Sequence, residues 1–146
     1  MHRYGFGALL TDDQWDHLTH GFSVTPFVAG EVLLSQGSQG KGIHLLLSGR
    51  VRVESVYADG TAAPLAFRSR GEILGESVLA GGGLSRNATV TALSSCVTIH
   101  TFAERFQRRL KELDLVPLLW ESVFKRQNES DQIRIQLARM PAERRL

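Results

Sequence analysis

The distribution of glycine limits the fold more than any other feature of the sequence. All 14 glycines lie between Gly5 and Gly83, and residues 84–146 contain none. Glycine suits the tight turns between strands and weakens the interior of a helix. We therefore expect short strands and turns in the first part of the chain and helices in the last part.

The length of 146 residues suits one domain whose core needs no disulfide or metal to hold it together. A single cysteine, Cys96, excludes an intrachain disulfide and a cysteine-ligated zinc or iron–sulfur site. No apolar run approaches the roughly 18 residues of a membrane span, and the N-terminus does not resemble a secretory signal. These features predict a soluble, cytoplasmic protein with no membrane partner. The net charge of +2 is too small to indicate nucleic-acid binding by itself.

The strand and helix signals favour a jelly roll with flanking helices. Thr11 and Gln14 can form a capping box at the start of a first helix, and Gly21 can end it. The Asp59-Gly60 pair is a strong hairpin signal. Strands are predicted at about 24–28, 31–35, 43–48, 50–57, 64–70, 88–93 and 96–101. Many short strands separated by turns are typical of a sandwich or barrel of the jelly-roll kind.

Helix is predicted again from Thr101. Thr101 and Glu104 fit a second capping box, followed by Phe102, Phe106 and Leu110 on one helix face.

A longer helix is predicted from near Asp114, with Pro117 tolerated in its first turn. Steps of three and four residues then connect Leu119, Val123, Arg126, Ser130, Ile133, Leu137 and Met140. This spacing predicts a homodimer seam with polar interruptions at Arg126 and Ser130. The alternative is a helix that packs on its own domain.

The most specific motif lies between Gly71 and Ala88. It reads Gly-Glu-Ile-Leu-Gly-Glu-Ser-Val-Leu-Ala-Gly-Gly-Gly-Leu-Ser-Arg-Asn-Ala. Its Gly75-Glu76 and Arg86-Asn87-Ala88 segments, at matching spacing, resemble the phosphate-binding cassette of cyclic-nucleotide-binding domains in the CRP/FNR superfamily of bacterial transcription regulators. The resemblance covers nearly the whole chain. It implies a mostly β fold with flanking helices, a jelly-roll or β-roll (double-stranded β-helix), followed by a long C-terminal dimerisation helix.

The resemblance also implies the ligand-binding residues. Glu76 would accept a hydrogen bond from the ribose 2′-hydroxyl, and Arg86 would bind the phosphate, for which a guanidinium is geometrically suited. Backbone groups of Gly75, Ser77 and Ala88 would line the phosphate.

On the long helix, the positions that would meet the base correspond to Arg126, Ser130 and Asp131. The alternative is that these helix residues are ordinary tolerated polar side chains.

Asn87 departs from the family pattern, which usually has Ser or Thr after the arginine. An amide can still donate to phosphate, but it is larger and supplies no hydroxyl. The effector is therefore left open: cAMP, another cyclic nucleotide, a different small ligand, or none. In the last case Arg86 and Glu76 would simply pair with each other.

No pattern indicates a metal, a cofactor or a catalytic centre. His17 and His20 share a helix face without a third ligand, and His44 and His100 lie on predicted strands without a His-x-His cluster. No serine sits in a nucleophile motif with a histidine base. The chain is therefore expected to be a sensor and not an enzyme.

Two parts are predicted: a cyclic-nucleotide-binding β-roll with an N-terminal helix over 1–113, and a long dimerisation helix over 114–146. Residues 140–146 look like the junction before a helix-turn-helix domain, so DNA binding is expected only through a domain outside this sequence. The expected function is to couple effector binding to DNA binding through the dimer helix. The alternatives are a nucleotide-blind dimerising module and a cyclic-nucleotide regulatory domain of a kinase or channel.

Overall fold

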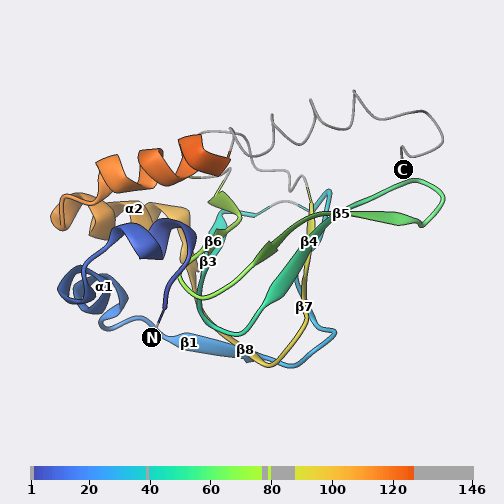
Figure 1. The fold of residues 1–146 in the computed structure, drawn as a ribbon, viewed down its shortest axis with the longest axis horizontal. Coiled ribbons are helices and arrows are strands. Elements are labelled where there is room, and N and C mark those ends of the chain that lie inside the picture. The colour runs from blue at the N-terminus through green and yellow to red at the C-terminus, as the bar shows by residue number, and fades with distance from the viewer. Residues whose placement is uncertain (1, 39, 77–78, 80–87, 127–146) are drawn as a thin grey trace.

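The computed structural model describes residues 2–38, 40–76, 79 and 88–126, and these form two antiparallel sheets with helices at one end (Figure 1). The strand order is β1-β8-β3-β6 in one sheet and β2-β7-β4-β5 in the other. The strands are β1 (Val24–Phe27), β2 (Val32–Leu34), β3 (Gly42–Ser48), β4 (Val51–Val56), β5 (Ala62–Arg68), β6 (Ile73–Leu74), β7 (Thr89–Ala92) and β8 (Cys96–Phe102). The predicted mostly β fold with flanking helices is confirmed.

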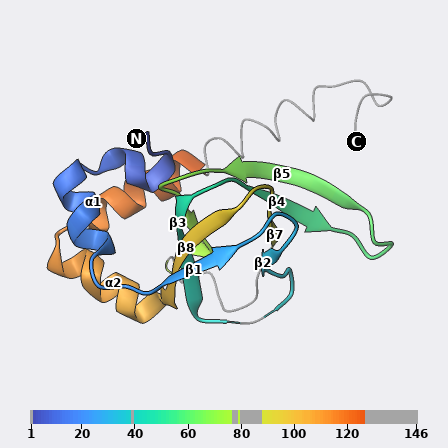
Figure 2. The same ribbon diagram turned by 90° about the horizontal axis from the view of Figure 1, so that it is seen from below.

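The helices cover the end of the sandwich that carries the N-terminal segment, while the β4–β5 hairpin extends away from them (Figure 2). They are a 3-10 helix (Gly5–Leu9), α1 (Asp12–Thr19) and α2 (Ala103–Glu112), and residues 116–126 form a further helical stretch. The larger core cluster joins these helices to the first sheet, with Phe6, Leu18, Ile43, Phe106 and Leu119 all buried. A smaller cluster, which includes Leu46, Val51 and Val90, fills the space between the sheets.

All seven predicted strands are present, and their ends differ from the prediction by at most two residues. Short apolar or alternating runs bounded by turn residues are the signal that predicted them, and β3 is the most buried of these strands. The sequence did not predict β6, since two residues are too few to show a period.

The capping box at the start of α1 is confirmed. The Thr11 hydroxyl accepts a hydrogen bond from the Gln14 backbone at 3.1 Å, and the Gln14 side chain accepts one from the Thr11 backbone at 2.8 Å. Gly21 follows the helix with φ of +80°, as its predicted role as the stop requires.

We expect Thr11→Ala to lower the free energy of unfolding by about 1 kcal/mol, because the Gln14 amide loses its acceptor. Chemical denaturation measures the change. Thr11→Ser keeps the hydroxyl and is the matched control. Equal stability of both variants would contradict the role of this cap.

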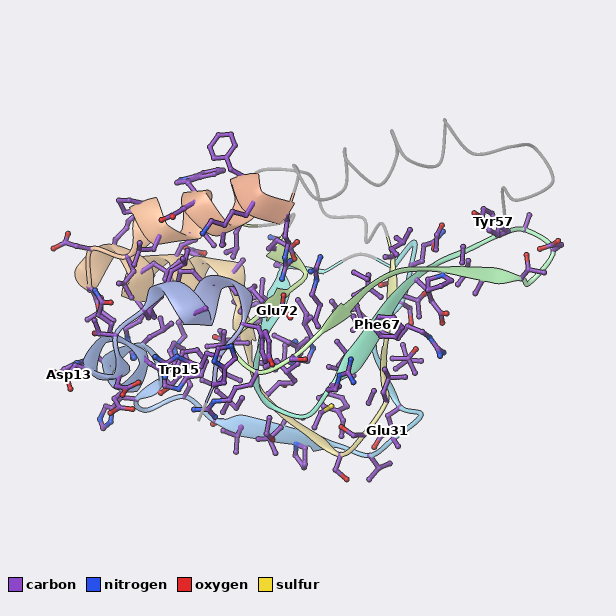
Figure 3. The ribbon with its side chains drawn as sticks, viewed as in Figure 1. Asp13, Trp15, Glu31, Tyr57, Phe67 and Glu72 are labelled. Carbon is purple, nitrogen blue, oxygen red and sulfur yellow. The ribbon has the colours of Figure 1, made fainter. Side chains whose placement is uncertain are left out.

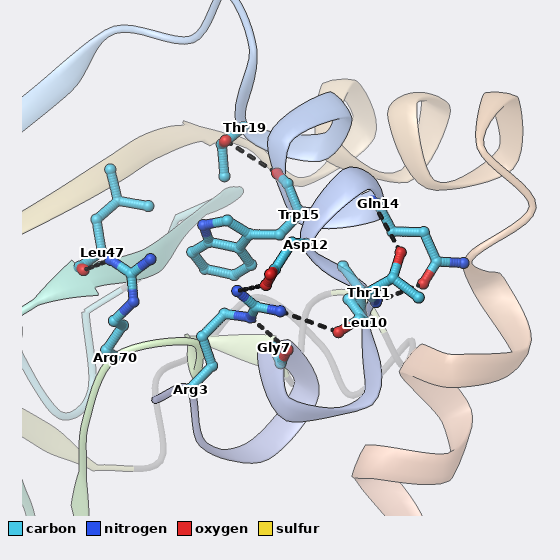
Figure 4. Close-up of polar contacts among 10 residues, drawn as sticks. All are labelled: Arg3, Gly7, Leu10, Thr11, Asp12, Gln14, Trp15, Thr19, Leu47 and Arg70. Carbon is cyan, nitrogen blue, oxygen red and sulfur yellow. Dashed lines mark hydrogen bonds and ion pairs between the residues drawn. The ribbon is translucent and has the colours of Figure 1, made fainter. Parts of the chain in front are cut away.

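Two guanidinium groups flank Trp15, which is buried between α1 and the sheet (Figure 3). The Arg3 and Arg70 guanidinium carbons lie 5.2 Å and 5.4 Å from the indole centroid (Figure 4). Arg3 also pairs with Asp12 at 3.0 Å, and Arg70 donates to the Leu47 carbonyl at 2.8 Å. In addition to the apolar core, these contacts link the N-terminal helices to β3.

The predicted second capping box is wrong. Thr101 belongs to β8 and is buried there, so its hydroxyl does not reach the helix start, and Phe102 precedes α2 without a side-chain cap. Phe106 and Leu110 are fully buried, but Phe102 is 70% exposed and does not share their face. The strand runs directly into the helix, which places Phe102 in extended backbone.

The last described helix begins at residue 116, two residues later than Asp114, because Asp114 has φ of +55° and ends the preceding turn. Pro117 lies in the first turn, as predicted. Leu119 is buried in the core of its own domain, and Val123 packs against that core. The first two seam positions therefore make intradomain contacts. Ser130, Ile133, Leu137 and Met140 lie outside the described residues, and dimerisation stays a prediction.

The Asp59-Gly60 turn joins β4 and β5 as predicted, and Gly60 has φ of +89°. The Asp59 carboxylate accepts hydrogen bonds from the Thr61 hydroxyl at 2.7 Å and the Thr61 backbone at 2.9 Å. These bonds lower the pKa of Asp59 below its usual value of 3.8, the hydroxyl being the larger cause.

We expect Thr61→Val to raise the pKa of Asp59 toward 3.8, because the hydroxyl donor is lost while the backbone donor stays. A carboxyl NMR titration measures it, with Thr61→Ser as the control. Since the pKa is lowered on folding, the contribution of Asp59 to stability is present above 3.8 and is lost as the pH falls through the folded pKa. An unchanged pKa in Thr61→Val would refute the assigned cause.

Candidate functional site

The cassette begins where β6 ends. β6 pairs with β3, so that Leu74 lies opposite His44, and the chain then turns at Gly75 with φ of +83°. Only glycine adopts this backbone without strain. The Leu79 amide donates to the Glu76 carbonyl at 2.9 Å, which marks a turn that starts at Glu76. The sequence therefore presents Glu76 directly after a strand held in the first sheet.

A cavity of about 100 Å³ lies at this point between the two sheets. Its described walls combine an apolar set with one acidic and two basic side chains. The apolar and glycine positions are Leu34, Val53, Ile73, Leu74, Gly75, Ala88 and Val90, and the charged ones are Arg68, Glu76 and Arg126. Apolar walls with a few charged groups are typical of small-molecule sites, although the volume of this cavity is below the range of about 300–1,000 Å³ that is usual for them.

Arg126 reaches this cavity from the last described helix. Its Nη1 forms an ion pair with Glu76, and its Nη2 donates to the Ile73 carbonyl at 2.9 Å. Its side chain is 19% exposed, so these contacts are partly shielded from water. Arg126 thus joins the helix of residues 116–126 both to β6 and to Glu76 of the cassette.

Glu72 is a second carboxylate beside Arg126 that the sequence analysis did not identify. Its side chain is 9% exposed, and Figure 3 marks its place in the interior between the helices and β5. Glu72 Oε2 accepts from the Ser69 backbone at 2.6 Å, and Oε1 lies 3.4 Å from Arg68 Nη1 and 3.9 Å from Arg126 Nη2. The i,i+4 spacing of Arg68 and Glu72 was the only sequence signal for this ion pair, and nothing in the sequence connects the pair to Arg126.

The structure brings four of the predicted site residues together around the cavity: Gly75, Glu76, Ala88 and Arg126. The other five lie outside the described residues, namely Ser77, Arg86, Asn87, Ser130 and Asp131. The alternative pairing of Arg86 with Glu76 is therefore not tested, because Arg86 is one of these five. Glu76 is paired with Arg126.

The histidines on the strands form a stacked pair. The His44 and His100 rings lie 4.1 Å apart at 12°, and His44 Nδ1 shares a hydrogen bond of 2.9 Å with Thr98. Among the described residues, no three His, Cys, Asp or Glu side chains gather closely enough to hold a metal ion. No helix in the described part of the chain has the length and apolar character needed to cross a membrane.

The jelly roll, the glycine turn and the carboxylate after it are the features of a cyclic-nucleotide-binding domain. Residues 24–112 match the family model of the cyclic nucleotide-binding domain, and the chain belongs to this family.

Known relatives and structures agree with this membership. The chain is 30% identical over 87 residues to the cyclic AMP receptor protein of Thermus thermophilus, which covers 60% of this chain and 40% of the relative. The crystal structure of the catabolite activator protein of the same organism superimposes with a TM-score of 0.76 at 25% identity, over 91% of this chain and 62% of that one. The c-di-GMP responsive regulator CLP of Xanthomonas campestris shares the fold, with a TM-score of 0.80 at 14% identity, over 90% and 66%. The chain thus spans less than two thirds of the two Thermus proteins.

Proposed function

We propose that this chain is the ligand-sensing domain of a CRP/FNR-type transcription regulator and that it binds a cyclic nucleotide in the cassette cavity. One observation carries the proposal: Arg126 of the last described helix meets Glu76 of the cassette inside one cavity. A ligand bound at Glu76 would therefore contact Arg126, which lies on the helix that we propose carries the signal.

In the proposed binding chemistry, two charged side chains and one amide contact the ligand. Glu76 accepts a hydrogen bond from the ribose 2′-hydroxyl, and Arg86 pairs with the phosphate, beside which Asn87 donates its amide. The ribose hydroxyl competes with Arg126 for the Glu76 carboxylate. Ligand binding therefore changes how firmly the helix is held to the cassette.

The remaining contacts follow from the family resemblance. Ser77 and Ala88 line the phosphate through their backbone groups. Ser130 and Asp131 contact the base. In this proposal residues 1–113 form the binding unit and residues 114–146 form the helix that carries the signal.

The signal requires two arrangements of a dimer, because a ligand shifts an equilibrium only through its different affinity for two states. The proposed dimer seam contains Leu119, Val123, Ser130, Ile133 and Leu137. Leu119 and Val123 also pack on their own domain, so the seam and the core would share them. Light scattering at micromolar concentration tests the dimer, and a monomer would contradict it.

cAMP is the first candidate ligand because the relative that is 30% identical is named a cyclic AMP receptor protein. A cyclic dinucleotide is the second, because the Xanthomonas regulator of the same fold is described as c-di-GMP responsive.

Isothermal calorimetry of the chain with cAMP, cGMP and c-di-GMP tests the proposal. We expect micromolar binding of one of them and a loss of about 10-fold to 150-fold in Arg86→Ala, the range for hydrogen bonds to a charged group. Arg108→Ala is the matched control, because Arg108 is exposed on α2, away from the cavity. No heat from any nucleotide would contradict the proposal and favour the nucleotide-blind dimerising module.

A further inference from the structure

A second concave site lies beside the cassette cavity, and Arg68 and Arg126 line both. Two adjoining cavities, of about 450 and 530 Å³, share Tyr4, Arg50 and Ser69, and we treat them as one feature, the outer groove. It is bounded by the N-terminal segment, the start of β4, the end of β5 and the helix of residues 116–126. Each cavity lies within the range of about 300–1,000 Å³ typical of small-molecule sites.

The outer groove is strongly basic. Its described walls carry Arg50, Arg68, Arg70, Lys125 and Arg126, with Glu72 as the acidic member. Glu72 already faces both Arg68 and Arg126 at 3.4 and 3.9 Å. A concave surface with an excess of one charge concentrates ligands of the opposite charge.

Two aromatic side chains stand beside these cations with much of their surface exposed to water. Tyr4 is 50% exposed and Phe67 is 53% exposed, and both line the groove. The Arg50 guanidinium lies 6.0 Å from the centroid of the Phe67 ring, at the outer limit of a cation–π contact. The groove therefore offers ring surface and positive charge side by side, which suits a planar anion.

We propose that the outer groove binds a small organic anion that carries an aromatic ring and a phosphate group. Arg50 and Lys125 supply charge to the phosphate, which competes with Glu121 for Lys125, and Tyr4 and Phe67 supply surface to the ring. This site is distinct from the cassette cavity and does not depend on cyclic-nucleotide binding.

The two sites share a wall, since Arg68 and Arg126 line both the outer groove and the cassette cavity. An anion in the groove competes with Glu72 and Glu76 for Arg126. Occupation of the groove therefore weakens the ion pair between Arg126 and Glu76. The NMR chemical shift of the Glu76 amide should change as a result.

NMR of the full chain with phenyl phosphate as the probe tests the site. We expect shifts of the Tyr4, Arg50 and Ser69 amides, with a smaller shift at Glu76. The apparent dissociation constant should rise about fivefold or more in Arg50→Gln and in Phe67→Ala. Arg108→Gln, an exposed arginine on α2, is the matched control and should leave it unchanged. All three positions are exposed, so the fold is retained.

Three results would overturn the proposal. Shifts at Gly75 and Glu76 without shifts at Tyr4 and Arg50 would place the probe in the cassette. Inorganic phosphate or phenol binding as tightly as phenyl phosphate would remove the need for a combined ring and charge. Equal affinity of the wild-type protein and Arg50→Gln would exclude the assigned cation. No cyclic nucleotide is used, so failure of the cassette to bind one leaves this test unaffected.

Discussion

Replacing Phe106 with alanine is expected to lower the free energy of unfolding by about 3–5 kcal/mol, the range for truncating a buried aromatic side chain. Phe106 is fully buried in the cluster that joins α2 to the N-terminal helices and the first sheet. Its removal leaves a cavity that these elements fill only in part. Urea denaturation followed by tryptophan fluorescence measures the change through Trp15, which belongs to the same cluster.

Phe102→Ala is the matched control, because the same side chain is removed four residues earlier. Phe102 is 70% exposed, so this substitution should change the free energy of unfolding by about 0.5 kcal/mol or less. Equal losses in the two variants would show that the face of α2 is wrongly assigned.

Glu72→Gln is expected to lower the free energy of unfolding by about 1.5–3 kcal/mol, because the charge-assisted contacts of the Glu72 carboxylate with Arg68 and Arg126 are lost. Arg68 and Arg126 both face the Glu72 carboxylate and are themselves largely shielded from water. The glutamine retains an acceptor for the Ser69 amide, so the loss measures the charge and not the side-chain volume. The same denaturation experiment gives the value.

Glu121→Gln is the control for this second prediction. Glu121 pairs with Lys125 at 3.6 Å on the same helix that carries Arg126, but its side chain is 50% exposed. An exposed pair contributes about 0.2–1 kcal/mol, so a small change is expected. A loss for Glu72→Gln no larger than for Glu121→Gln would mean that the Arg68–Glu72–Arg126 contacts are solvated.

Local patterns predicted the elements whose signals are local. The strand signal of residues 50–57 predicted β4, and the capping-box pattern of Thr11 and Gln14 predicted the start of α1. Thr101 carried the same capping signal, but the capping box predicted from it was wrong. The pairing of β8 with β3 extends the strand through Phe102, and tertiary contacts override a local preference of about 1 kcal/mol.

The candidate site was predictable only in part, for a similar reason. The motif at Gly75-Glu76 lies in one segment, and the family resemblance implied that Arg126 meets the ligand. The direct contact of Arg126 with Glu76 and its proximity to Glu72 depend on how the helix of residues 116–126 packs on the sandwich. Leu115 and Leu119 anchor that packing in the core, and the spacing in the sequence fits a dimer seam as well as packing on the same domain.

The topology of the first sheet has a consequence for synthesis on the ribosome. β1 pairs with β8, so that residues 24–27 form their ladder with residues 96–99. Until β8 leaves the exit tunnel, β1 is a strand without its partner, and the short helix α1 lacks the core in which Trp15 and Leu18 are buried. The first sheet can therefore form only after residues 96–99 are available for pairing, and such long-range pairing makes folding slow. A nascent chain halted before residue 96 would expose the edge of β1 to other chains.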